Sequence, residues 1–243
     1  MIWVTDRTGR FPQRPHYKPQ ELDSECEAVV CKFLQDQHSK IEFPVLTDDL
    51  TTLIEQDVSD LDLYADLSTE GEDVEGATDF FPNRKPVVLI SKGLSLQSRR
   101  ENRLRTTLAH EYGHVRFHAF LWTSERSSQL RLSADFAPAK GPRCRRATIL
   151  STSKTDWMEW QAGYASGALL MPITALQKLI RSSLREWGMY GRLSTNSSQA
   201  QEIVKRMAAL FSVSSEAAKV RLSQLGYLEN STQDVSLFDK SRP

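Results

Sequence analysis

The fold of this chain is decided by residues 107–118, TLAHEYGHVRFH, which hold an H-E-x-x-H pattern in a helix-forming context. Because residues four apart stack on one face of an α-helix, His110 and His114 can present two imidazole nitrogens to one tetrahedral metal ion. Glu111 lies one position round the helix from the first histidine, where a carboxylate can accept a proton from water instead of binding the metal. The pattern therefore predicts a zinc site that carries its own general base.

The neighbouring residues favour a half-buried helix over a surface helix with two chance histidines. Helical spacing places Leu104, Leu108 and Val115 near one stripe together with Glu111. A glutamate on a buried stripe needs either a partner or a function. We expect this helix to begin near Ser98.

A catalytic zinc ion usually has three protein ligands and one open position, so a third ligand is expected outside this helix. The best candidate is Glu159, in residues 156–172, DWMEWQAGYASGALLMP, which have the pattern of a second helix. The alternative is an ordinary solvated glutamate, which the presence of the H-E-x-x-H pattern disfavours. Pro172 marks the end of this helix or the first turn of the next one. The face of Glu159 continues through small residues that let another helix approach closely: Ala162, Gly163, Ser166 and Gly167.

Two stretches of the chain carry a family resemblance. Residues 107–118, followed by residues 159–172 (EWQAGYASGALLMP), resemble the ImmA/IrrE family of zinc metallopeptidases, best known for cleaving phage-type and stress-response repressors. Residues 75–80 and 85–90 also resemble the small sheet that leads into the metal helix of this family. The similarity spans roughly residues 41–228.

Matched residue by residue, the resemblance implies that His110 and His114 bind zinc, that Glu111 is the catalytic base and that Glu159 is the third ligand. It implies one zinc ion per chain and a protein substrate, a helix-turn-helix repressor or a similar regulatory protein. The expected fold class is α+β. A zincin-like metallopeptidase domain, with a small β-sheet packed on helices, would be followed by a C-terminal helical module that resembles a helix-turn-helix.

We expect the chain to be organised in consecutive parts. These are an N-terminal arm and helix (1–40), the metallopeptidase domain (41–175) with an insertion loop at 121–155, the C-terminal helical module (176–228) and a disordered tail (229–243). Within them, a Pro-rich segment, 11–19, is expected to be irregular. Local periodicity predicts helices at 21–35 and 47–56, the latter capped by Thr47, and two or three strands from residues 61–65, 77–81 and 87–90.

Residues 199–225 form a pattern of two helices around a turn at 212–214. In a DNA reader the second helix, with Lys219 and Arg221, would enter a major groove. The alternative, which we favour, is a packing and substrate-docking module. Two basic residues are few for DNA binding, and the chain, with 31 basic and 31 acidic residues, lacks the basic footprint of a dedicated binder.

Composition favours a cytoplasmic protein without membrane association. The sequence contains no run of about 18 apolar residues, and its first residues lack the pattern of a secretion signal. Its three cysteines, Cys26, Cys31 and Cys144, form neither a disulfide framework nor a paired zinc spacing. Charge is uneven, because residues 41–83 hold thirteen acidic and no basic residues, whereas residues 84–146 hold fourteen basic and four acidic ones. Such blocks are ordinarily solvated faces, although a basic rim could orient an acidic substrate.

Several roles stay open at the level of sequence. His118 and Tyr164 are candidates for the oxyanion donor, and His118 could instead form a bond behind the metal ligands. A fourth ligand, Cys144 or His118, would indicate a closed structural zinc site rather than a catalytic one. The remaining alternative is a non-catalytic anti-repressor or transcription-associated protein that keeps the metallopeptidase fold. The intact Glu111 argues against it, because a binding-only scaffold needs no base.

Overall fold

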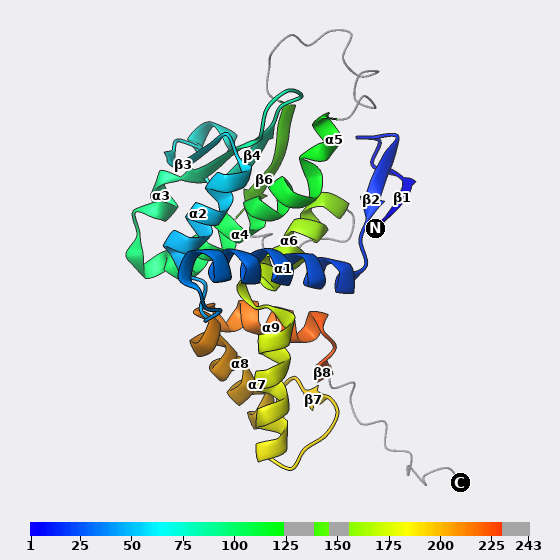
Figure 1. The fold of residues 1–243 in the computed structure, drawn as a ribbon, viewed down its shortest axis with the longest axis vertical. Helices are drawn as coiled ribbons and strands as arrows, with labels where there is room; N and C mark the ends of the chain where they lie inside the picture. Colours follow the sequence, from blue (N-terminus) through cyan, green and yellow to red (C-terminus); the bar gives the residue numbers. More distant parts are fainter. Residues whose placement is uncertain (124–138, 146–155, 230–243) are drawn as a thin grey trace, which may run out of the picture.

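The computed structural model describes residues 1–123, 139–145 and 156–229, with the backbone alone for residues 123 and 139–145. Its elements, labelled in Figure 1, are β1 (Ile2–Thr5), β2 (Gln13–His16), α1 (Pro19–His38), α2 (Thr47–Asp57), β3 (Asp60–Ala65), η1 (Ser68–Glu70), β4 (Val74–Phe80), β5 (Val87–Ser91), α3 (Lys92–Ser95), η2 (Ser98–Arg100), α4 (Glu101–His118), α5 (Phe120–Thr123), β6 (Ala139–Arg145), α6 (Trp157–Leu170), α7 (Ile173–Glu186), β7 (Leu193–Ser194), α8 (Ser198–Phe211), α9 (Ser215–Gln224) and β8 (Leu228–Glu229). The expected α+β class is confirmed. In Figure 1, α1 crosses the middle of the molecule, between a part that bears the main sheet and a part built from α7, α8 and α9.

The main sheet has the strand order β3-β5-β4-β6, with β3 parallel to β5 and β4 antiparallel to both of its neighbours. The strands expected at 61–65, 77–81 and 87–90 are confirmed as β3, β4 and β5. All but one residue of β4 are buried, because this strand lies inside the sheet and packs against α4. The sheet therefore supports one side of the helix that carries the H-E-x-x-H pattern.

The prediction of a loop throughout 121–155 is wrong at both α5 and β6. Residues 139–145, AKGPRCR, show no apolar alternation, and they form a strand because the backbone of β4 offers them an antiparallel partner, with Gly76 opposite Cys144. The rest of that predicted loop, 124–138 and 146–155, and residues 230–243 of the predicted tail lie outside the described residues.

The first two long helices agree with the sequence, apart from their ends. α1 is longer than the expected 21–35, since Pro19 suits a first helical turn and the Glu21 carboxylate accepts a hydrogen bond from the Lys18 backbone N–H. α2 begins at Thr47, which is therefore not its N-cap. The cap position belongs to Leu46, and the Thr47 hydroxyl instead donates to Glu101 at the start of α4.

The expectation of an irregular N-terminal arm is wrong, because β1 and β2 form an antiparallel hairpin. The Asp6 carboxylate shapes its turn by accepting hydrogen bonds from the backbone of Thr8 and Phe11, and it also accepts one from the Trp157 indole of α6. Arg10 makes two hydrogen bonds to Asp156, the N-cap of α6. The hairpin is thereby fastened to the beginning of α6.

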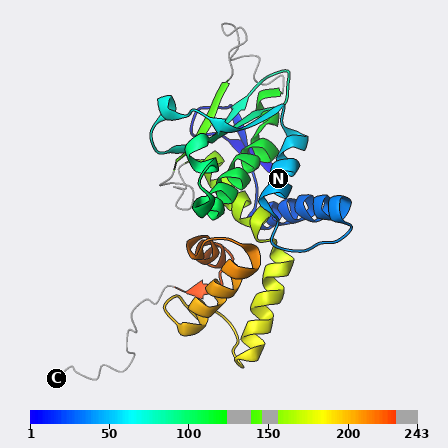
Figure 2. The same cartoon turned by 90° about the vertical axis from the view of Figure 1, so that its left-hand side faces the viewer.

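The C-terminal part contains two consecutive helices, α8 and α9, but a helix-turn-helix module and a DNA-reading function are not confirmed. Figure 2 shows α7, α8 and α9 together below the sheet-bearing part. One continuous hydrophobic core runs from Leu22 of α1 to Leu222 of α9. Arg221, one of the two basic residues considered for DNA, is 1% exposed and pairs with Asp23 of α1. Within the described part of the chain, no helix combines the length and apolar character needed to cross a membrane.

The buried ion pair of Arg221 and Asp23 allows a prediction about the stability of variants. Arg221→Met leaves the Asp23 carboxylate, 6% exposed, without its cation, and should lower the free energy of unfolding by about 3–5 kcal/mol. Asp23→Asn combined with Arg221→Met should recover much of this loss, because it removes both charges. Denaturant unfolding followed by circular dichroism measures all three proteins.

The matched control is Arg192→Met, which removes the solvent-exposed pair of Arg192 and Glu229 and should cost less than about 1 kcal/mol. Equal effects of the Arg221 and Arg192 substitutions would contradict the buried role of Arg221.

Candidate metal centre

The close crossing of α4 and α6 places the candidate site. A Cβ atom added at Gly113 of α4 would lie 3.0 Å from the Cα atom of Ala162, a tight contact, so a glycine here favours the close approach of the two helices. Glu159 lies about one turn before Ala162 on α6 and is therefore brought opposite the two histidines. The small face predicted for α6 serves two neighbours, because Gly167 lies instead against Arg221, whose Cδ would be 3.3 Å from an added Cβ.

The two histidines and Glu159 converge as ligands of one metal ion would. Nε2 of His110 lies 3.2 Å from Oε2 of Glu159, Nε2 of His114 lies 3.2 Å from Oε1, and the two Nε2 atoms are 3.2 Å apart. Ligand atoms about 2.0–2.1 Å from a tetrahedral zinc ion lie about 3.3 Å from one another. The spacing thus fits a metal ion bound by His110, His114 and Glu159.

Electrostatics keep the carboxylate of this group ionised. Burial opposes the charge on Glu159, but hydrogen bonds with His110 and His114 outweigh it, and the pKa of Glu159 lies below its ordinary value. Burial likewise disfavours the charged form of His114, yet its contacts with Glu159 raise its pKa. The ionised carboxylate of Glu159 attracts a divalent cation, which would replace a proton at Nε2 of His114.

Glu111 lies beside this group without joining it. Its Oε2 accepts a hydrogen bond of 2.7 Å from the Thr78 hydroxyl of β4, and its Oε1 has no hydrogen-bond partner among the described residues. Burial raises the pKa of Glu111, against the opposing effect of His114 and His110. A fully buried carboxylate held at one oxygen, with a raised pKa, is suited to accept a proton and return it.

The strand β4 makes room for Glu111. A Cβ atom added at Gly76 would lie 2.6 Å from Oε1 of Glu111 and 2.7 Å from Cγ2 of Thr107. Gly76 and Thr78 point to the same side of the strand, toward α4, because side chains alternate along a strand. Sequence reasoning missed both residues. The alternation of β4 shows that they share a face, but nothing local shows that this face meets Glu111.

Of the other residues considered for the site, His118 and Tyr164 have partners elsewhere and do not bind at the metal position. Both nitrogens of the buried His118 are engaged, Nδ1 with Nδ1 of His114 at 3.0 Å and Nε2 with Oε1 of Gln161 at 3.0 Å. Burial lowers the pKa of His118 well below its ordinary value, so the ring is neutral. The Tyr164 hydroxyl donates to Asp23, so this side chain is not an oxyanion donor at the site. The side chain of Cys144 lies outside the described part of the chain.

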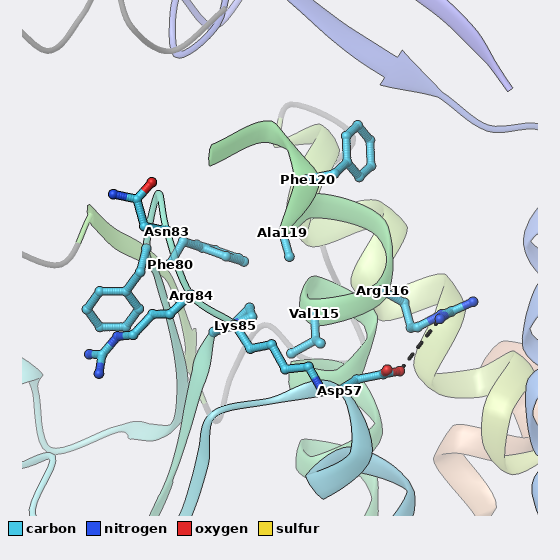
Figure 3. Close-up of a pocket in the computed structure, with 11 residues that line it drawn as sticks. Asp57, Phe80, Asn83, Arg84, Lys85, Val115, Arg116, Ala119 and Phe120 are labelled. Carbon is cyan, nitrogen blue, oxygen red and sulfur yellow. Dashed lines mark ion pairs between the residues drawn. The ribbon is translucent and has the colours of Figure 1, made fainter. Parts of the chain in front are cut away.

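The end of α4, after His114, borders a hollow of about 400 Å³ (Figure 3). Val115 and Ala119 of α4 form one wall, and the residues that connect β4 to β5 form the other. Its rim carries basic side chains. Arg84 lies over the ring of Phe81, and Arg116 lies 3.6 Å from Asp57.

A comparison with protein families agrees with this geometry. The model of the IrrE N-terminal-like domain, a peptidase family, matches residues 66–223, which is more than half of the chain. The chain belongs to the ImmA/IrrE family. No curated protein matches the chain. Membership in the ImmA/IrrE family gives the chain a metallopeptidase-type fold, and the matched segment includes α4 and α6, which carry the candidate metal centre. It begins after the N-terminal hairpin.

The crowding at Gly76 predicts that this ImmA/IrrE chain tolerates no side chain there. Gly76→Ala should lower the free energy of unfolding by about 1–3 kcal/mol, because the new methyl group meets Glu111 and Thr107 in a packed core. Gly93→Ala is the matched control, since its Cβ would meet only Ser91 Oγ, at 3.6 Å. Thermal or denaturant unfolding compares the two variants. Equal stability of both would show that β4 does not approach Glu111 as described.

Proposed function

We propose that this chain is a zinc-dependent endopeptidase in which Glu111 is the general base. The observation that supports this best is the convergence of three ligand atoms beside a buried carboxylate that is not itself a ligand. A purely structural site would not need that carboxylate, and burying it without a function would be costly.

Zinc is the metal that we propose, because two imidazole nitrogens and one carboxylate oxygen form a ligand set found in zinc peptidases. His110, His114 and Glu159 would hold it. When bound, zinc supplies a Lewis acid that makes water more acidic and polarises a carbonyl group.

The protein's own contribution is proton transfer by Glu111. The Oε1 atom accepts a proton from the water that attacks the peptide carbonyl carbon, while Thr78 holds Oε2 in place. A C–O bond forms, the peptide C–N bond breaks, and Glu111 returns the proton to the departing amine nitrogen. The raised pKa of Glu111 supports this role, because a stronger base takes the proton and a neutral acid can then release it.

The substrate that we propose is a regulatory protein, such as a helix-turn-helix repressor, which would place the reaction in the cytoplasm. Family membership and a C-terminal helical module packed on the peptidase body support a protein partner. Arg221 is turned into the core, so α9 offers even less positive charge to DNA than its sequence indicates. The basic rim of the hollow beside α4 is a suitable place for an acidic substrate segment.

Metal analysis tests the first step of this proposal. The purified protein should contain about one zinc ion per chain, and His110→Ala or His114→Ala should abolish it, because two ligands hold zinc far more weakly than three. His38→Ala is the control, since His38 pairs with Asp49 at the surface and should leave the zinc content unchanged. Wild-type zinc content in either ligand variant would contradict the assignment.

Glu111→Gln separates metal binding from chemistry. The amide preserves the shape of the side chain but cannot accept a proton, so zinc should stay bound while cleavage falls by about 10²-fold or more. Helix-turn-helix repressors are the first substrates to assay, by gel electrophoresis of the products. Glu101→Gln, at the exposed start of the same helix, is the control. Cleavage by Glu111→Gln at the wild-type rate would exclude Glu111 as the base, and a zinc-loaded wild type that binds such a repressor uncut would favour the anti-repressor alternative.

A further inference from the structure

A chain of buried hydrogen bonds leads from the metal centre to the N-terminal hairpin. Nδ1 of His114 lies 3.0 Å from Nδ1 of His118, and Nε2 of His118 lies 3.0 Å from Oε1 of Gln161. The Gln161 amide donates in turn to the backbone oxygen of Pro15 in β2, at 2.9 Å. His114, His118 and Gln161 are each at most 1% exposed, so water does not compete with these bonds.

The direction of every bond in this chain follows from its last member. A backbone carbonyl can only accept, so Gln161 must turn its NH₂ group toward Pro15 and its oxygen toward His118. That oxygen also only accepts, and His118 must therefore carry its proton on Nε2. In a neutral ring Nδ1 of His118 is then an acceptor, which requires the proton of His114 to be on Nδ1.

We propose that Gln161 and His118 are positioning residues of the metal centre, which hold His114 in the tautomer that offers Nε2 to the metal. The carbonyl of Pro15 anchors this relay, defined as the bonds that join Pro15, Gln161, His118 and His114. The inference rests on the proposed function, since it assigns a role toward the proposed zinc ion. Partners that orient a histidine ligand typically change metal affinity by about 10–100-fold when they are removed.

The two histidine ligands differ in this respect. Nδ1 of His110 has no hydrogen-bond partner among the described residues, whereas Nδ1 of His114 is tied to the relay. The relay also includes a residue outside the segment that matches the family, because Pro15 precedes residue 66. The N-terminal hairpin thus helps to orient His114, in addition to covering the beginning of α6.

Zinc affinity, measured by competition with a chelating dye, tests the relay in the full chain. Gln161→Met keeps the length of the side chain but removes both polar groups, and it should weaken zinc binding by about 10–100-fold. Gln161→Glu keeps an acceptor for His118 but sets a second acceptor against the Pro15 carbonyl, so it should also weaken binding. Thr8→Val is the matched control, because it removes the hydrogen bonds of the Thr8 hydroxyl to Asp6 within the hairpin turn and leaves the relay intact.

Imidazole nitrogen NMR of the zinc-loaded wild type gives a second measurement that does not depend on a variant. The expected spectrum has the His118 proton on Nε2, and this fixed tautomer should be lost in Gln161→Met. A His118 proton on Nδ1, or zinc affinity in Gln161→Met equal to that of Thr8→Val, overturns the relay while the proposed function stands. A wild type that binds no zinc overturns the proposed function itself.

Discussion

The close contact between Gly113 and Ala162 is the constraint on which the rest of the structure depends. Because an added Cβ at Gly113 would lie 3.0 Å from the Ala162 backbone, larger residues at either position would push the two helices apart. This crossing determines how near Glu159 comes to His110 and His114, whose ligand atoms are 3.2 Å from its carboxylate oxygens. A wider separation of the helices would leave two buried histidines and a glutamate without a common centre.

The crossing also places polar groups in the core, and each one requires a specific partner. Glu111 is held by Thr78, and Arg105 of α4 donates to the backbone oxygens of Val45 and Ser212. Ser212 lies in the turn between α8 and α9, so α4, which carries the H-E-x-x-H residues, is bonded directly to the C-terminal helices. A buried cation without such acceptors would be strongly destabilising. The C-terminal helices therefore belong to the structural support of α4, whatever partner they contact.

The sequence predicted those parts of the structure that are determined by residues close together in the chain. Helical periodicity and the H-E-x-x-H spacing located α4, and the expectation of a third ligand pointed to Glu159, which the structure places beside the two histidines. Strand β6 was missed because residues 139–145 pair through their backbone with β4, a partner that lies far away in the sequence. Thr78 and Gly76 were missed for a related reason. Their roles depend on which helix covers the sheet, and tertiary packing alone decides that.

The contribution of the N-terminal hairpin is the hardest to recognise from sequence, because its key acceptor is a backbone carbonyl that any residue would supply. Two of its contacts act on the same half of α6. Arg10 pairs with Asp156, whose carboxylate accepts hydrogen bonds from the backbone N–H groups of Met158 and Glu159. Pro15 binds Gln161. Since Glu159 lies between these two points, the hairpin restrains the helical turn that presents the carboxylate and, through the relay, the ring of His114.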